Sequence, residues 1–237
     1  MFRYTVSKER RTKNLAGFVE RSREKDPQGA AALADEFSRH DLIELMRSPL
    51  AKYGMRIDNV ADAYTVWWIN AWQASRGVSD DVSNATTQAV RNQVMASMAA
   101  TPSFTGAGDA EKQELAESLL IQAVLIAGAV EQSKGNRQQL QAIGQAAAQG
   151  AKGLGIDLST IELTEQGFVP QRAGAIAPDA ARPVEPTATK EPRVTAATTA
   201  PADGGGSSAG TYTLIAAAVA GLGGAYWLGT RRTNAKG

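Results

Sequence analysis

The sequence predicts an all-α fold, a compact bundle of about six helices, followed by a disordered linker and one transmembrane helix. Before Pro170, apolar residues recur at spacings of three and four, which is typical of helices that bury one face. The next stretch holds five prolines and almost no large apolar side chain, so it cannot bury enough surface to fold. An uncharged run of 18 residues then follows. The predicted segments are a helical domain (1–170), a Pro/Ala/Thr/Gly-rich linker (171–211), a transmembrane helix (212–229) and a basic tail (230–237).

Capping residues divide the first third of the domain into short helices. Ser7 is a favourable N-cap for a helix that we expect to run to about Lys25. The pair Asp26–Pro27 ends that helix and starts the next one. A further short helix carries Leu42 and Leu45.

The central helix is predicted over Val60–Arg76, where Asn59 is the N-cap and Gly77 ends the helix. Large apolar residues lie on one side of this helix, and Asp62, Thr65, Asn70 and Gln73 take the other.

Three more segments complete the predicted domain. Ser79–Asp81 opens a helix that Thr101–Pro102 stops, and Asp109 caps the next one. Its stretch 119–127 is apolar nearly all round, as expected at the centre of a bundle, and is too short to span a bilayer. Asn136 caps a final helix, after which a short extended strip contains Ile161, Leu163, Phe168 and Val169.

The aromatic residues of the central helix are the weak candidates for a binding site. This cluster contains three of the four tryptophans of the chain, and its members are Tyr64, Trp67, Trp68 and Trp72. Two interpretations fit them: a core face of the helix, or an aromatic groove for a sugar, a peptide or a lipid.

Residue types exclude most catalytic and metal sites, so the sequence predicts no catalytic residue, no cofactor and no metal. The chain has no cysteine, and His40 is its single histidine. Residues Gly206–Gly210 match the Gly-x-Ser-x-Gly pattern of a nucleophile elbow, but they lie in the linker rather than on a strand-to-helix turn. No glycine-rich phosphate loop follows a predicted strand.

Charge argues against nucleic acid as a partner. Residues 1–170 hold 18 Lys and Arg against 20 Asp and Glu, a net charge of −2. The N-terminus is basic, and we expect a solvated helix face there; its cations are Arg3, Lys8, Arg10, Arg11 and Lys13.

The uncharged run is long enough to cross a bilayer, because 18 helical residues span about 27 Å. Tyr212 and Trp227 are placed as interfacial anchors, and Arg231 and Arg232 follow the span. Small residues repeat every four positions, and they would let a second helix approach closely or would arise by chance in an Ala/Gly-rich span; they are Ala217, Gly221, Ala225 and Gly229.

The positive charges place the C-terminus in the cytoplasm and the domain outside it, in the periplasm of a bacterial inner membrane. The first residues, however, contain no apolar run typical of a signal peptide. Either the true start lies upstream of Met1, or the protein is tail-anchored with a cytosolic domain. The C-terminal region also resembles a bacterial sorting signal that a protease removes, since it combines the glycine-rich Gly204–Ser207, the apolar span and the arginines.

Several motifs resemble an uncharacterised bacterial family, classed only as a domain of unknown function. The likeness covers roughly residues 2–170, and its most specific part is the run Asn59–Tyr64. It also includes Arg10-Arg11-x-x-Asn14-Leu15-x-x-Phe18-Val19, Asp26-Pro27, Tyr53-Gly54-Met55-Arg56 and Leu163-Thr164-x-x-Gly167-Phe168-Val169-Pro170. The resemblance implies a helical, exported domain, since members usually begin with a signal peptide, and it implies no catalytic residues.

The function expected from these observations is that of a membrane-anchored, non-enzymatic envelope protein. Its partners would be the bilayer and an envelope protein or glycan, with self-association through the span. One alternative is a carboxylate-based enzyme acting on glycans of the cell envelope, with an acid/base pair drawn from Asp58, Asp62, Glu36 or Asp41 beside the tryptophans. A tail-anchored cytosolic adaptor is the other.

Overall fold

The computed structural model of the chain describes residues 1–171. This part is mostly helical, which confirms the helical prediction, but a small antiparallel sheet closes it, so the class all-α is corrected. The elements are α1 (Lys8–Arg23), α2 (Pro27–Arg39), α3 (Leu42–Leu45), α4 (Arg47–Ala51), α5 (Val60–Arg76), α6 (Asn84–Ala99), α7 (Pro102–Thr105), α8 (Asp109–Gln132), α9 (Arg137–Gly153), the 3-10 turn η1 (Leu158–Thr160), β1 (Ile161–Thr164) and β2 (Gly167–Pro170).

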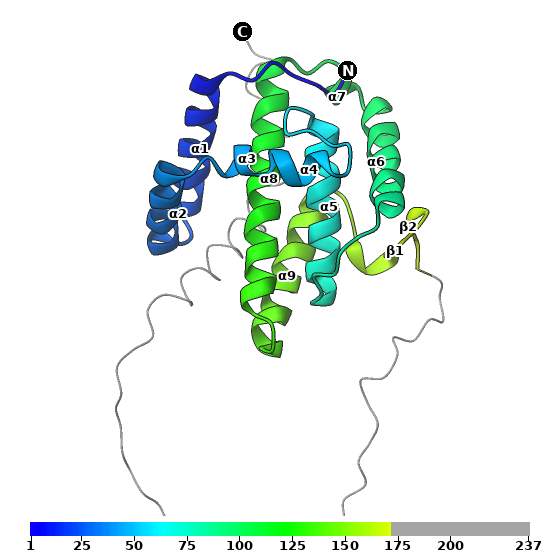
Figure 1. The fold of residues 1–237 in the computed structure, drawn as a ribbon. Helices are drawn as coiled ribbons and strands as arrows, with labels where there is room; N and C mark the ends of the chain where they lie inside the picture. Colours follow the sequence, from blue (N-terminus) through cyan, green and yellow to red (C-terminus); the bar gives the residue numbers. More distant parts are fainter. Residues whose placement is uncertain (172–237) are drawn as a thin grey trace, which may run out of the picture.

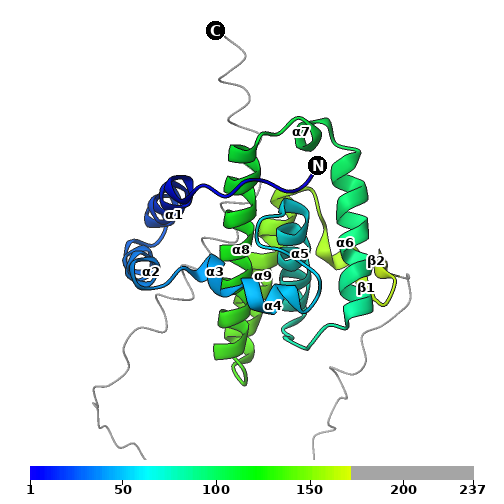
Figure 2. The same ribbon diagram turned by 45° about the horizontal axis from the view of Figure 1, so that its top comes forward.

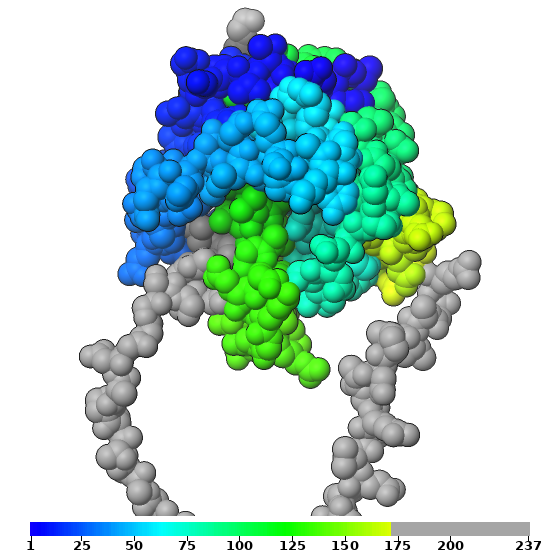
Figure 3. All heavy atoms as spheres, in the orientation of Figure 1, coloured from blue at the N-terminus to red at the C-terminus, as the bar shows by residue number. Residues whose placement is uncertain are grey.

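Helices α5, α8 and α9 form the centre of the domain (Figure 1). Helices α1 and α2 pack together on one side of α8, whereas α6 and the hairpin lie on the other side of the centre (Figure 2). The space-filling view in Figure 3 shows α1 to α4 covering the upper part of α8, whose lower end projects beneath them.

Several helices begin at the residues that the sequence predicts. The side chain of Ser7 accepts a hydrogen bond from the Arg10 amide, and Asp26 accepts one from Gly29. Asn59 caps α5 in the same way. Gly77 ends α5 with φ +69°, a left-handed conformation that glycine adopts without strain.

Two predicted helix starts are wrong by a few residues. Helix α6 begins at Asn84 rather than at Ser79–Asp81, because the hydroxyl of Ser83 accepts the Thr86 amide hydrogen bond. The N-cap of α8 is Gly108 rather than Asp109. The Asp109 carboxylate accepts instead from the Thr5 amide, at 3.0 Å, across the fold.

Helix α5 is buried on more sides than its pattern predicts, since Asp62 and Thr65 on its polar side are fully buried. Helix α8 is equally central. Within residues 1–171 it is the one helix with the length and apolar composition to cross a membrane, but 61% of its apolar window is buried inside the domain. That burial is typical of the core helix of a globular domain.

The predicted extended strip folds as a hairpin in which Leu163 pairs with Phe168. Gln93 of α6 holds its outer edge: the Phe168 amide donates to Gln93 Oε1 at 2.9 Å, and Gln93 Nε2 donates to the Phe168 carbonyl at 2.8 Å. A side-chain amide thus takes the place of a neighbouring strand.

The remaining predictions lie outside the described residues. These are nearly all of the linker (171–211), the span (212–229), the tail (230–237), the anchors Tyr212, Trp227, Arg231 and Arg232, and the small-residue row Ala217, Gly221, Ala225 and Gly229.

Candidate functional site

The four aromatic residues of α5 divide between the core and a groove. Trp67 is 0% exposed, and its indole Nε1 donates to Gln122 Oε1 of α8 at 3.2 Å. Trp72 is half-buried and donates to the Ile161 carbonyl at 3.1 Å. Tyr64 and Trp68 are also half-buried, and both line an open groove. The core interpretation therefore holds for Trp67, and the groove interpretation holds for Tyr64 and Trp68.

The groove, which we call the aromatic groove, has a volume of about 580 Å³. Helices α5, α6, α7 and α8 supply most of its wall, and the end of α9 with the segment that follows it supplies the rest. Its lining residues are Tyr64, Trp68, Val94, Ser97, Met98, Thr101, Phe104, Leu115, Lys152, Gly153, Leu154, Gly155 and Ile156.

Trp68 is the residue of the groove whose polar group is unsatisfied. Its ring packs edge-to-face on Tyr64 and Phe168, with centroids 6.1 and 5.0 Å away. Its Nε1 is buried without a hydrogen-bond partner among the residues that the structure describes. Burying an N–H group without a partner costs free energy.

The charge of the groove resides on one side chain. Burial raises the pKa of Tyr64 to about 12, so its hydroxyl stays neutral at physiological pH. Lys152 is then the one charged residue among the described residues that line the groove. The site therefore suits an apolar ligand with a single anionic end.

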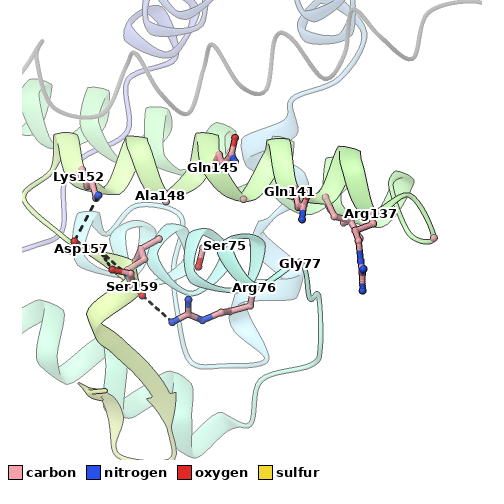
Figure 4. Close-up of a pocket in the computed structure, with 14 residues that line it drawn as sticks. Ser75, Arg76, Gly77, Arg137, Gln141, Gln145, Ala148, Lys152, Asp157 and Ser159 are labelled. Atoms are coloured by element: carbon pink, nitrogen blue, oxygen red, sulfur yellow. Dashed lines mark hydrogen bonds and ion pairs between the residues drawn. The ribbon is translucent and has the colours of Figure 1, made fainter. Parts of the chain in front are cut away.

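A polar cleft adjoins the aromatic groove at Lys152, which lines both (Figure 4). This basic cleft, with a volume of about 750 Å³, lies between the end of α5, the length of α9 and η1. Arg76 of α5 donates from Nη2 to the carbonyls of Leu158 and Ile161, both at 3.2 Å. The residues of this cleft carry no sequence motif, so the sequence alone does not predict it.

The four carboxylates of the enzyme hypothesis lie elsewhere than in the aromatic groove. Hydrogen bonds from Arg56 lower the pKa of Asp58, which also binds Arg3. Asp62 is buried against Arg91, and this burial raises the pKa of its carboxyl group.

The two remaining candidate carboxylates, Glu36 and Asp41, lie in the segment of α2 and α3. Oε1 of Glu36 lies 4.0 Å from Nε2 of the exposed His40. Asp41 caps α3 and accepts from Arg11 at 2.8 Å. Among residues 1–171, no group of three or more His, Cys, Asp or Glu side chains could hold a metal ion.

Arg11 is not on a solvated face, which corrects one expectation for the basic N-terminus. Its side chain is only 11% exposed, and its Nε donates to Glu117 at 2.9 Å. Glu117 is itself 1% exposed and also accepts from Asn14 and Gln113. This cation therefore holds α1 onto α8.

Comparison with known proteins identifies the family. No match was found among curated proteins or among solved structures. A family described as a "Family of unknown function (DUF6683)" matches residues 5–171, which is nearly all of the part that the structure describes. That span includes the aromatic groove and the basic cleft, and it covers more than half of the chain; the protein therefore belongs to the family of unknown function DUF6683.

Proposed function

We propose that this protein is a membrane-anchored, non-enzymatic protein of the bacterial envelope, and that its helical domain binds a ligand in the aromatic groove. The observation that carries the proposal is the groove itself. It combines an apolar wall that is open to solvent with one charged side chain, Lys152, among the described residues that line it.

The lining of the groove supports binding rather than catalysis. No carboxylate of the described part of the chain lines it, so an acid/base pair beside the tryptophans has no source there. Apolar walls with a few polar groups are typical of sites that hold a ligand in one orientation.

The membrane anchor in this proposal is the uncharged run from Tyr212 to Gly229, with the arginines behind it on the cytoplasmic side. The Pro-rich linker gives the domain a reach of tens of ångströms from the bilayer. The domain would then meet its ligand in the periplasm, in the bilayer surface or on an envelope protein or glycan.

Site-specific photocrosslinking in cells tests the groove directly. Ser97 lines the groove and is exposed, so p-benzoylphenylalanine can replace it with little disturbance. Asn92 is exposed on the same helix outside the groove and is the matched control. We expect ultraviolet light to give adducts with Ser97→p-benzoylphenylalanine that the Asn92 variant does not form. Identical adduct patterns from both positions would refute a ligand site in the groove.

A further inference from the structure

The aromatic groove and the basic cleft meet at one residue. Lys152 lines both, and the chain after it forms a shared wall: residues 153–156 face the groove, and residues 157–159 face the cleft. We infer that the groove holds the acyl chain of an anionic amphiphile, whose charged head group binds at Lys152 and Arg76. This inference rests on the proposed function, and it names the chemical class of the ligand.

The composition of the groove favours an acyl chain over a sugar or a peptide. Its polar lining groups are few: two hydroxyls on α6 and the loop after it (Ser97 and Thr101), the neutral Tyr64 hydroxyl, and the Trp68 indole. A glycan or an extended peptide would bring many more polar groups than these can pair, and each unpaired group would oppose binding. An acyl chain brings none and buries only apolar surface.

The cleft supplies charge where the groove ends. Arg76 and Lys152 point toward the η1 segment, whereas Arg137 lies at the opposite end of α9 (Figure 4). Arg76 uses only Nη2 for hydrogen bonds within residues 1–171, so its other guanidinium nitrogens are available to an anion. Among the described residues that line the cleft, three cations face one carboxylate, Asp157.

The existing partner of Lys152 is easily displaced. Its Nζ lies 3.9 Å from Asp157 Oδ2, and both side chains are exposed to solvent. Hydrogen bonds from the Ser159 hydroxyl and amide to the carboxylate lower the pKa of Asp157, which therefore stays satisfied without the lysine. A carboxylate or phosphate head group can take its place beside Lys152.

Photoaffinity labelling of the full chain in native membranes tests this inference. The probes are a diazirine-bearing palmitic acid, a diazirine-bearing cetyl alcohol of the same length, and a diazirine-bearing phosphatidylglycerol. We expect the acid or the anionic phospholipid to label peptides within residues 94–104 or 152–156, and the alcohol to label them several-fold less. The anionic probe that labels these peptides most strongly shows whether the ligand is a free fatty acid or a phospholipid.

Charge variants separate the head-group contact from general lipid contact. Lys152→Gln should reduce labelling by the anionic probe roughly two- to fivefold, as expected for loss of one exposed charge contact. Lys134→Gln is the matched control, because Lys134 is also exposed and paired with an exposed carboxylate, Glu131, but lies outside the groove. It should leave labelling unchanged.

The outcomes distinguish this inference from the proposed function. Equal labelling by acid and alcohol, or no effect of Lys152→Gln, would overturn the anionic head group. Labelling spread over surfaces outside the groove would mean contact with the bilayer and would overturn the site. If no probe labels the groove while the Ser97 photocrosslinker still forms adducts, the ligand is not an amphiphile and the proposed function stands; if neither gives adducts, both fail.

Discussion

At the scale of single residues, the carboxylate of Glu117 is a buried charge that needs hydrogen-bond and ion-pair partners. It lies on the central helix α8 and accepts hydrogen bonds from Arg11, Asn14 and Gln113. Asn14 and Arg11 both belong to α1, so one anion attaches that helix to the core. A buried charge is tolerated only when its partners are all in place.

Glu117→Gln tests this attachment. The substitution keeps the size of the side chain but removes the buried one of the charges that compensate Arg11, so we expect a loss of about 2–4 kcal/mol in the free energy of unfolding. Urea unfolding of the full chain, followed by tryptophan fluorescence, measures the loss.

A matched control separates burial from pairing as such. Glu20 also pairs with an arginine, Arg23, but both side chains are largely exposed. Exposed pairs contribute little to stability, so Glu20→Gln should leave the unfolding midpoint almost unchanged. Equal effects of the two substitutions would show that Glu117 is not the anchor of α1.

At the scale of elements, the crossing of α5 and α9 depends on a glycine. A Cβ atom built at Gly144 would lie 2.8 Å from the backbone carbonyl oxygen of Ala74. That oxygen cannot move without moving α5, so the two helices approach closely only because residue 144 has no side chain. The basic cleft lies along this same crossing.

Gly144→Ala should therefore lower the free energy of unfolding by about 1–3 kcal/mol, because α9 must shift away from α5. The shift would also move Lys152 relative to Arg76, so binding of an anionic probe should weaken in parallel. Thermal and urea unfolding of the full chain measure the first effect.

At Gly128 of α8, an alanine is expected to stabilise the fold rather than destabilise it. A Cβ atom there meets nothing within 4 Å, so Gly128→Ala adds helix propensity without a clash. A gain of roughly 0.5–1 kcal/mol in the free energy of unfolding is expected. If both alanine variants stabilise the fold, the close approach at Gly144 is not a constraint.

At the scale of the whole molecule, the domain ends at the hairpin from which the proposed linker continues. Gln93 holds β2 against α6, while Trp72 and Arg76 both donate to the Ile161 carbonyl at the start of β1. These contacts come from two different helices. They hold the hairpin to the body of the domain.

Protease accessibility tests the proposed topology. With the gene expressed from its native locus and the domain tagged internally, we expect added protease to digest the domain in spheroplasts but not in intact cells. Protection of the domain in spheroplasts would instead place it in the cytosol and make the protein tail-anchored. Intact-mass analysis of the purified protein gives both of its ends, and a mass ending near Gly206 would establish cleavage at the sorting signal.

The sequence by itself determined the features that depend on neighbouring residues. The caps Ser7, Asp26, Asn59 and Asn136 were predicted correctly, because each side chain bonds an amide two or three residues along the chain. Gly77 at the end of α5 follows from the same kind of local geometry. The central place of α8 followed from its apolar surface on all sides.

Only the tertiary structure decided features that join distant segments. Asp109 fits an N-cap by local rules, yet Thr5, 104 residues away, takes its carboxylate. The four aromatic residues share one helix face in the sequence, but the packing of α6, α8 and the segment after α9 decides that Trp67 is sealed while Tyr64 and Trp68 line a groove. The reason is physical: helix periodicity defines which residues share a face, whereas burial depends on which other elements cover that face.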